Sequence, residues 1–253
     1  AVGPPHTPAA LPLHRGAFEL KYVLDEQTAA RVRDWAMENL SSDPHASGDV
    51  ADGYHVNNLY LDTPHFDVFH RTPQSGRRKF RLRRYGRESQ LWLEEKRKRQ
   101  GCVFKRRVLI DERELGERLF ASEPDADWIG AWFRKRLENR KLLPACQVTY
   151  RRFARVKATP NGPIRLTMDD QLRTAPADAW LVPAQPAPSN CLLDGRVILE
   201  LKFIEAMPAL YRRLIDDLKL GVGSFSKYRT SISTVFPADV LKTGRTTPGA
   251  LHA

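Results

Sequence analysis

The sequence predicts an α+β fold in which eight mostly antiparallel strands form a closed barrel or a sandwich, with helices beside them. Two observations indicate this. Eight short segments of the 253-residue chain alternate apolar and polar residues, as strands with two different faces do. Short connections with turn residues, such as Gly86 and the Gln100-Gly101 pair, join neighbouring segments, and short connections of this kind link antiparallel strands. Strands of this number and length favour a barrel or a sandwich.

The first half of the chain contains five of these strands and one helix. Residues 18–24 read as a strand, and residues 25–40 read as a helix because apolar or small side chains recur at helical spacing. A second strand, 54–61, ends at Asp62-Thr63-Pro64. Three further strands are expected to form a meander, at residues 77–85, 90–98 and 102–111.

The second half supplies the remaining three strands. A helix is expected over 128–139, followed by a hairpin that turns at Pro160-Asn161-Gly162. The strands of that hairpin and the last strand of the sheet cover residues 146–157, 163–169 and 197–204. A proline-rich surface loop, 176–190, precedes the last strand, and a helix over 208–219 follows it.

Composition excludes several classes of protein. A hydrophobic fraction of 42%, with five Trp and eleven Phe, argues against a disordered chain. No run of about 18 apolar residues exists, so no transmembrane helix is expected. The three cysteines are widely spaced and form no CxxC pair, which makes a disulfide framework or a zinc knuckle improbable. These features predict a cytoplasmic protein.

The two ends of the chain differ in composition from the rest. Residues 1–15 are proline-rich and lack the continuous apolar stretch of a secretory signal, so we expect a flexible N-terminal tail. Residues 16–236 form one predicted domain. Residues 237–253 are expected to form a flexible C-terminal tail.

The positive charge of the chain is concentrated in the predicted meander. The net charge is +11, and residues 77–107 contain fourteen basic and three acidic residues, which accounts for all of it. A cation source this concentrated implies an anionic partner. The partner could be nucleic acid, a phosphorylated small molecule, polyphosphate or an acidic membrane surface.

Charged residues in the strands recur as i, i+2 pairs, which place both side chains on one face. The pairs are Glu19/Lys21, Arg81/Arg83, Glu94/Lys96, Lys105/Arg107 and Glu200/Lys202. Any antiparallel sheet with one face in solvent would show this pattern. Its recurrence in strands from both ends of the chain favours a barrel with a charged interior and an apolar exterior covered by helices. Such an interior fits a linear chain of phosphates better than a duplex.

Nine short motifs in one order make the chain resemble a known family. They are Arg15…Glu19-Leu20-Lys21-Tyr22, Asn58-Leu59-Tyr60-Leu61-Asp62-Thr63, Lys79-Phe80-Arg81-Leu82-Arg83-Arg84-Tyr85-Gly86, Leu93-Glu94-Glu95-Lys96, Val103-Phe104-Lys105-Arg106-Arg107, Tyr150-Arg151-Arg152, Ile164-Arg165-Leu166-Thr167-Met168-Asp169, Leu199-Glu200-Leu201-Lys202 and Phe225-Ser226-Lys227-Tyr228. With them the chain resembles the VTC domain, the polyphosphate polymerase domain of vacuolar transporter chaperone proteins. That domain belongs to the CYTH or triphosphate tunnel metalloenzyme superfamily.

The resemblance implies a fold and an activity. The fold would be a tunnel of eight antiparallel strands with flanking helices. The activity would be a metal-dependent phosphotransferase reaction, in which the ATP γ-phosphate is transferred to a growing inorganic polyphosphate chain. It implies ATP and polyphosphate as partners, a divalent cation (Mn²⁺ or Mg²⁺) as cofactor, and no nucleic acid. The full eukaryotic proteins of this kind carry membrane segments, so a membrane-protein partner is also left open.

The resemblance also implies roles for individual residues. Catalytic roles fall to Lys21, Arg81, Arg83 and Lys96. Phosphate-binding positions are Lys105, Arg107, Arg152, Arg165, Lys202 and Lys227. Glu200 matches the metal-binding glutamate, and Glu19 and Glu94 match carboxylates that share metal binding in the triphosphatase branch.

Other readings of these residues stay open at this point. Glu200 could form a structural ion pair, and Asp169 could be a second metal contact or only an acid at a strand end. Tyr60, Tyr85 and Tyr150 are expected to pack rather than bind. Five further arginines are expected outside the tunnel or at its mouth: Arg77, Arg78, Arg84, Arg97 and Arg99.

Three other functions compete with polyphosphate synthesis. The chain could be a triphosphatase of the same fold, although its inner face is dominated by Arg and Lys rather than Glu. It could be a non-catalytic binder of polyphosphate or triphosphate, since binding and transfer need the same cations. Nucleic-acid binding through the basic meander is disfavoured, because the sequence has no recognised nucleic-acid motif.

Overall fold

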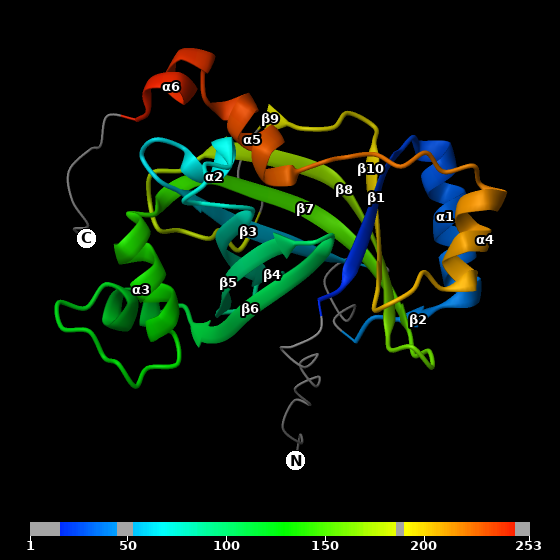
Figure 1. The fold of residues 1–253 in the computed structure, drawn as a ribbon, viewed down its shortest axis with the longest axis horizontal. Helices are drawn as coiled ribbons and strands as arrows, with labels where there is room; N and C mark the ends of the chain where they lie inside the picture. Colours follow the sequence, from blue (N-terminus) through cyan, green and yellow to red (C-terminus); the bar gives the residue numbers. More distant parts are fainter. Residues whose placement is uncertain (1–15, 45–52, 186–189, 246–253) are drawn as a thin grey trace.

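A curled antiparallel sheet forms the centre of the structure, a computed structural model that describes residues 16–44, 53–185 and 190–245 (Figure 1). Eight long strands follow one another across it in the order β1-β10-β8-β7-β3-β4-β5-β6. They are β1 (Phe18–Leu24), β3 (Tyr54–Asp62), β4 (Arg78–Tyr85), β5 (Gln90–Arg99), β6 (Cys102–Asp111), β7 (Leu143–Lys157), β8 (Ile164–Pro176) and β10 (Val197–Phe203). All eight predicted strands are present, and the predicted antiparallel fold is confirmed.

Two strands are longer than the sequence predicted. β7 begins at Leu143 and β8 continues to Pro176, and the two remain paired as far as Cys146 and Pro176. A register shift between Thr149 and Arg151 interrupts the alternation of side chains. The alternating sequence pattern therefore ends there, although the two strands stay paired beyond it. Two two-residue strands add to the rim: β2 (Ser41–Ser42) pairs with β7, and β9 (Asn190–Cys191) pairs with β8.

The sheet curls far enough for its two edge strands to meet. Ala17, next to β1, forms an isolated bridge with Val103 of β6, with backbone hydrogen bonds of 3.1 and 2.9 Å. A side-chain contact crosses the same seam, since Lys96 Nζ donates to Glu19 at 2.8 Å. The edges therefore meet at one end of the sheet, and its concave face becomes the inside of a barrel.

Helices pack around this barrel in three places. They are α1 (Glu26–Asn39), α2 (Asp67–His70), α3 (Ala131–Arg140), α4 (Ala209–Asp217), α5 (Lys227–Val235) and α6 (Ala238–Thr243), with one π-helical turn at Leu115–Leu119. Figure 1 shows α1 and α4 together on one side, α3 at the opposite end, and α5 and α6 above β7 and β8.

Most of the hydrophobic core lies between the strands and these helices, and part of it lies on the inner face, where Tyr60 packs against Tyr228 of α5. One cluster joins Val32 of α1 and Tyr211 of α4 to Leu199 and Leu201 of β10. The other joins outward side chains of β3, β4 and β5, and the inward Tyr60 and Tyr150, to helices α2, α3, α5 and α6. Apolar burial on the outer face of β4, β5 and β10 leaves the inner face of these strands to charged residues, as the sequence predicted.

Three helices were not predicted. The α5 segment is rich in Thr, Ser and β-branched residues, which have low helix propensity, yet Ser226 caps it by accepting from Arg229 N. Helix α6 lies within the segment for which the sequence predicts a flexible tail, and its buried Leu241 belongs to the core. The predicted tail residues 1–15 and 246–253 lie outside the described residues.

Candidate functional site

The alternation of the strands brings the predicted cations to one enclosed surface. Arg81 on β4 and Glu94 on β5 are paired in register, and so are Lys21 on β1 and Glu200 on β10. The side chains of each pair lie on the same side of the sheet and contact each other. The opposite faces of β4 and β10 carry the buried apolar residues Phe80, Leu82, Leu199 and Leu201. The charged side chains therefore line the inside of the barrel.

The first group of charges surrounds one carboxylate. Arg81 donates to Glu94 through Nε at 2.6 Å, and Lys105 Nζ lies 2.5 Å from the other Glu94 oxygen. Arg83 Nε is 4.0 Å from Glu94. Burial alone would raise the pKa of Glu94, but Arg81, Lys105 and Arg83 lower it well below its usual range. We call Glu94, Arg81, Arg83 and Lys105 the arginine cluster.

Tyrosine hydroxyls hold the arginines in place. Arg81 donates to the Tyr60 hydroxyl at 3.0 Å, and Arg83 donates to the Tyr150 hydroxyl at 2.9 Å and to Asn58 Oδ1 at 2.8 Å. The sequence predicts that these tyrosines pack, and they are buried, but their hydroxyls also accept hydrogen bonds from the guanidinium groups. Each arginine fork is thereby oriented before a ligand binds.

A third tyrosine, Tyr85, has an altered acidity. Its hydroxyl accepts a hydrogen bond from Arg83 at 3.4 Å. Burial would raise the pKa of Tyr85, but Arg83 and Lys105 lower it to about 7. The phenol therefore titrates near neutral pH and can offset part of the charge of the arginine cluster.

The second group contains three carboxylates. Glu200 accepts from Lys21 at 2.6 Å and lies 3.3 Å from Lys227, and Asp169 lies 2.6 Å from Lys227. Glu19 contacts Lys96 at 2.8 Å. Two further cations complete the group: Lys202, which lies 3.5 Å from both Glu19 and Glu200, and Arg152, which makes two hydrogen bonds to Asp169 at 2.6 and 2.7 Å. We call this group the lysine cluster.

Burial affects the carboxylates and the lysines of this cluster differently. Burial would raise the pKa of Asp169, but Arg152 and Lys227 lower it to about 2. Burial lowers the pKa of Lys202 to about 8, because Glu19 and Glu200 compensate only in part. The carboxylates are thus ionised at neutral pH, and Lys202 is close to losing its proton.

One cation of the inner face was missed by the sequence analysis. Lys79 on β4 donates to the Ser226 hydroxyl at 2.9 Å and, within the described part of the chain, pairs with no carboxylate. Burial and the neighbouring Lys96 and Lys21 lower its pKa well below the usual value. Lys79, Arg81 and Arg83 stand at every second position of β4, so the alternation of the strand could have placed Lys79 on the inner face.

The predicted site residues are not all equally central. Eight of the ten predicted cations belong to the two clusters. Arg107 and Arg165 are paired in register with Glu94 and Lys202, but their side chains make other contacts. Arg165 pairs with Asp43 at 2.8 Å, and the Arg107 guanidinium lies 4.1 Å from the centroid of the Trp92 ring. Lys227 comes from helix α5 rather than from a strand, and it contacts both Asp169 and Glu200.

Three of the arginines expected outside the tunnel or at its mouth, Arg78, Arg97 and Arg99, lie on the outer face, and Arg77 is exposed just before β4. Arg78 contacts Glu95 at 3.1 Å, and Arg97 and Arg99 are exposed. Arg84 differs from the expectation, because only 3% of it is exposed. Its guanidinium donates to the backbone oxygen of Val182 and pairs with Glu112, so it is a structural residue under the proline-rich loop.

The lining offers a poor donor set for a metal held by protein alone. No group of three or more His, Cys, Asp or Glu side chains suited to a metal ion occurs among the described residues. The two oxygens of Glu200 already contact three ammonium groups, those of Lys21, Lys227 and Lys202. A divalent cation on Glu200 would have to displace them, so the residues present do not fit a protein-only metal site.

The family comparison gives one match that covers most of the chain. The family model described as the VTC domain matches residues 17–236. No match was found among curated proteins. In the described residues, no helix is both long enough and apolar enough to cross a membrane.

Solved structures of similar fold have little sequence identity to this chain. An adenylate cyclase candidate from Bacillus halodurans is 11% identical, with a TM-score of 0.48, and the match covers 83% of this chain and 95% of that one. HpAC1 from Hippeastrum, described as an adenylyl cyclase candidate with a dominant triphosphatase activity, is 13% identical, with a TM-score of 0.44. That match covers 92% of this chain and 98% of HpAC1.

Proposed function

The chain belongs to the VTC domain family, and on that premise we propose that it is a polyphosphate polymerase. It would transfer the γ-phosphate of ATP to the end of an inorganic polyphosphate chain inside the barrel. The observation that supports this most is the convergence of Arg and Lys from six strands and one helix on one enclosed surface. The strands are β1, β4, β5, β6, β7 and β10, and the helix is α5.

The arginine cluster is suited to the reacting phosphoryl group. Transfer of a phosphoryl group requires alignment and neutralisation of charge on its oxygens, with little covalent help from the protein. Arg81 and Arg83 offer planar forks whose direction is set by Tyr60, Asn58 and Tyr150. The attacking group would be the terminal phosphate of the chain, so no side-chain nucleophile is needed.

The lysine cluster is suited to the rest of the phosphate chain. Lysine is a mobile point charge that follows an anion without demanding one geometry. Lys21, Lys96 and Lys202 remain about a quarter exposed, at 26%, 27% and 25% of their side chains, so they can move from their carboxylates to phosphate oxygens. Such exchange would let successive phosphates pass without a large change in contact energy.

A triphosphatase is the second candidate, and the four carboxylates of the lining favour it. Glu19, Glu94, Asp169 and Glu200 place oxygen donors beside the cations. We propose that any divalent cation, Mn²⁺ or Mg²⁺, arrives on the phosphates of its substrate, because the lysines occupy the protein oxygens. A non-catalytic binder of triphosphate or polyphosphate is the third outcome of the test below.

Incubation of the purified chain with ATP and Mn²⁺ or Mg²⁺ separates these functions. Long chains on a polyphosphate-stained gel, together with ADP, are expected. Orthophosphate alone would identify a triphosphatase, and binding without turnover would identify a binder. Arg212→Gln on α4 is a suitable control variant, since Arg212 is exposed on the helix that covers the outer face.

Partners and compartment follow from the same proposal. We propose ATP and inorganic polyphosphate as the ligands and leave a membrane-protein partner open. The three cysteines, Cys102, Cys146 and Cys191, are free thiols, which supports the reducing environment of the cytoplasm.

A further inference from the structure

The outer face of the meander carries arginines at one end of its strands. Arg78 of β4 is paired in register with Arg97 of β5, and Arg97 is paired with Phe104 of β6. Arg106 lies two residues further along β6, paired with Glu95. Because paired residues share a face, these arginines lie on the outside of the barrel. They cannot belong to the site described above.

Helix α3 adds two more arginines to the same place. Arg136 Nε lies 3.4 Å from Glu95 Oε2, while Arg78 lies 3.1 Å from the other oxygen of the same carboxylate. Arg140, one turn beyond Arg136, donates to the backbone oxygen of Gln74 at 3.0 Å. We call Arg78, Arg97, Arg106, Arg136 and Arg140, which surround Glu95, the outer arginine cluster.

This cluster has more positive charge than its surroundings compensate. Glu95 is the one carboxylate that pairs with its members among the described residues, and it is 9% exposed. Burial and the nearby Arg78 and Arg136 lower the pKa of Arg140. Five guanidinium groups against one carboxylate leave an excess that favours a bound anion.

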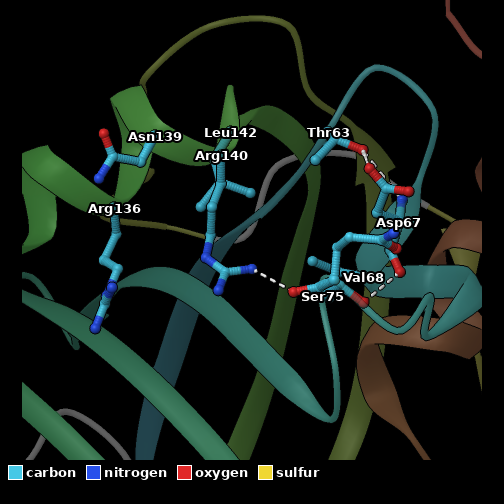
Figure 2. Close-up of a pocket in the computed structure, with 9 residues that line it drawn as sticks. Thr63, Asp67, Val68, Ser75, Arg136, Asn139, Arg140 and Leu142 are labelled. Carbon is cyan, nitrogen blue, oxygen red and sulfur yellow. Dashed lines mark hydrogen bonds between the residues drawn. The ribbon is translucent and has the colours of Figure 1, made fainter.

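A cavity opens beside these arginines. It has a volume of about 460 Å³ and is lined by Arg136, Asn139 and Arg140 of α3 and by residues of the segment from Thr63 to Ser75. Figure 2 shows Arg136 and Arg140 extending from α3 in the same direction, with Thr63, Asp67 and Ser75 across the cavity. The Asp67 carboxylate accepts a hydrogen bond from the Thr63 hydroxyl at 2.7 Å.

The outer arginine cluster lies next to inner-face cations on the same two strands, β4 and β5. Lys79 and Lys96 face inward and are paired in register, directly next to the outward pair Arg78 and Arg97. The wall of the barrel therefore carries cations on both faces at this end of β4 and β5. An anionic polymer leaving or entering here would meet the outer arginines without a gap.

We propose that the outer arginine cluster holds the stretch of an inorganic polyphosphate chain that lies outside the tunnel. This inference rests on the proposed function, because it requires a phosphate polymer in the barrel. The cluster would add affinity for long chains and leave the affinity for a triphosphate, which the inner face alone can hold, unchanged.

Aromatic residues distinguish this ligand from a single-stranded nucleic acid. Binding of successive bases requires a series of exposed rings on which they stack. Phe104 is 37% exposed, but Trp132 is covered by Arg106, whose guanidinium lies 4.3 Å from the ring centroid. A cluster of forks with one exposed ring fits a polymer of phosphates without bases.

The test compares a short and a long ligand on one double variant. Binding of tripolyphosphate and of a polyphosphate of about 100 units is measured for wild type and for Arg136→Gln/Arg140→Gln. We expect the variant to lose about tenfold in affinity for the long chain, with a shallower salt dependence, and to keep its affinity for tripolyphosphate. The matched control is Arg212→Gln/Arg213→Gln on α4, which removes the same charge from exposed positions on another part of the surface.

A second variant guards against a loss caused by misfolding. Glu95→Gln removes the carboxylate of the cluster and should increase the affinity for the long chain severalfold, with tripolyphosphate binding unchanged. Equal long-chain affinity in wild type and both cluster variants would overturn the inference. The inference would also be overturned if the cluster variants lost affinity for a single-stranded oligonucleotide and kept their affinity for polyphosphate. Failure of wild type to bind tripolyphosphate would instead contradict the proposed function.

Discussion

The two charge clusters inside the barrel differ in composition and in support. The arginine cluster has one carboxylate, Glu94, and its arginines are oriented by hydrogen bonds to Tyr60, Asn58 and Tyr150. The lysine cluster has three carboxylates, and its lysines contact those carboxylates rather than tyrosine hydroxyls.

The difference indicates a division of work along one channel. Fixed forks suit a step in which charge develops at a defined place, because oriented donors need no rearrangement during the reaction. Lysines that exchange between carboxylate and phosphate suit a chain that moves. Substitutions in each cluster and changes of pH test this division.

Removing the buried charge of Asp169 should have the largest effect, on stability. Asp169 is fully buried between Arg152 and Lys227, so Asp169→Asn leaves two cations without their carboxylate. We expect a loss of about 3 kcal/mol in the free energy of unfolding, measured by denaturant titration. Tripolyphosphate should restore part of this loss, because an anion that binds the folded state replaces the missing charge. An unchanged unfolding midpoint would show that the lysine cluster does not depend on this ion pair.

Exchanging Arg and Lys between the clusters tests whether geometry or charge matters. Arg83→Lys keeps the charge but loses the fork that reaches Asn58 and Tyr150, so we expect a decrease of about 100-fold in the proposed polymerase activity. Lys96→Arg should keep activity within about threefold, since Lys96 acts as a point charge. The measurement is the initial rate of ADP release. Equal sensitivity of the two positions would contradict the division of work, and thermal melting curves serve as the control for folding.

The pH dependence of binding should follow the lysines of the two clusters. Burial lowers the pKa of Lys105 to about 7 and that of Lys202 to about 8, so both are charged at pH 6 and mostly neutral at pH 9. The affinity for tripolyphosphate should therefore fall over this interval, with uptake of roughly one proton on binding at pH 8. Isothermal titration calorimetry in buffers of different ionisation enthalpy measures that uptake.

The stability of the ligand-free protein should change in the opposite sense. The folded state binds fewer protons at these two lysines than the unfolded chain does, so their contribution to stability rises with pH from about 7 to 10. Lys105→Met should remove the part of the pH-dependent change near pH 7, and Lys202→Met should remove the part near pH 8. A binding profile that both variants leave unchanged would assign the titration to other groups.

The smallest effect is expected from Tyr60→Phe. The hydroxyl of Tyr60 accepts a hydrogen bond from Arg81 at 3.0 Å, and its loss frees one side of that fork. We expect a decrease of about fivefold in activity with little change in stability, because the ring remains in the core. The control is Tyr22→Phe, since Tyr22 is fully buried beside α1 and α4 and away from both clusters.

Much of this arrangement could be predicted from the sequence, because strands encode their faces by alternation. Glu200 and Lys202 lie between Leu199, Leu201 and Phe203, and the structure confirms that the two kinds of residue lie on opposite faces. The same alternation predicted all eight strands. The motif match identified eight cations that meet in the two clusters.

Other features depend on tertiary packing that no local pattern shows. Lys227 reaches Asp169 from a helix whose composition is unfavourable for helices, so its segment gave no helical signal. The Tyr60 hydroxyl bonds to Arg81 on the neighbouring strand, and the Tyr150 hydroxyl bonds to Arg83 two strands away, so both contacts require the register of the sheet. Arg84 became buried because the loop around Val182 folds over it, a contact between residues 98 positions apart.

The barrel is expected to open most easily at the seam between β1 and β6. β1 is paired with β10 at seven positions, but in the described residues it meets β6 only through the bridge at Ala17 and Val103, beside the contact of Lys96 with Glu19. Few hydrogen bonds have to break there, so local opening costs less at this join than anywhere else around the circumference. A polymer held inside could then be freed sideways along its whole length, without either of its ends having to be drawn through.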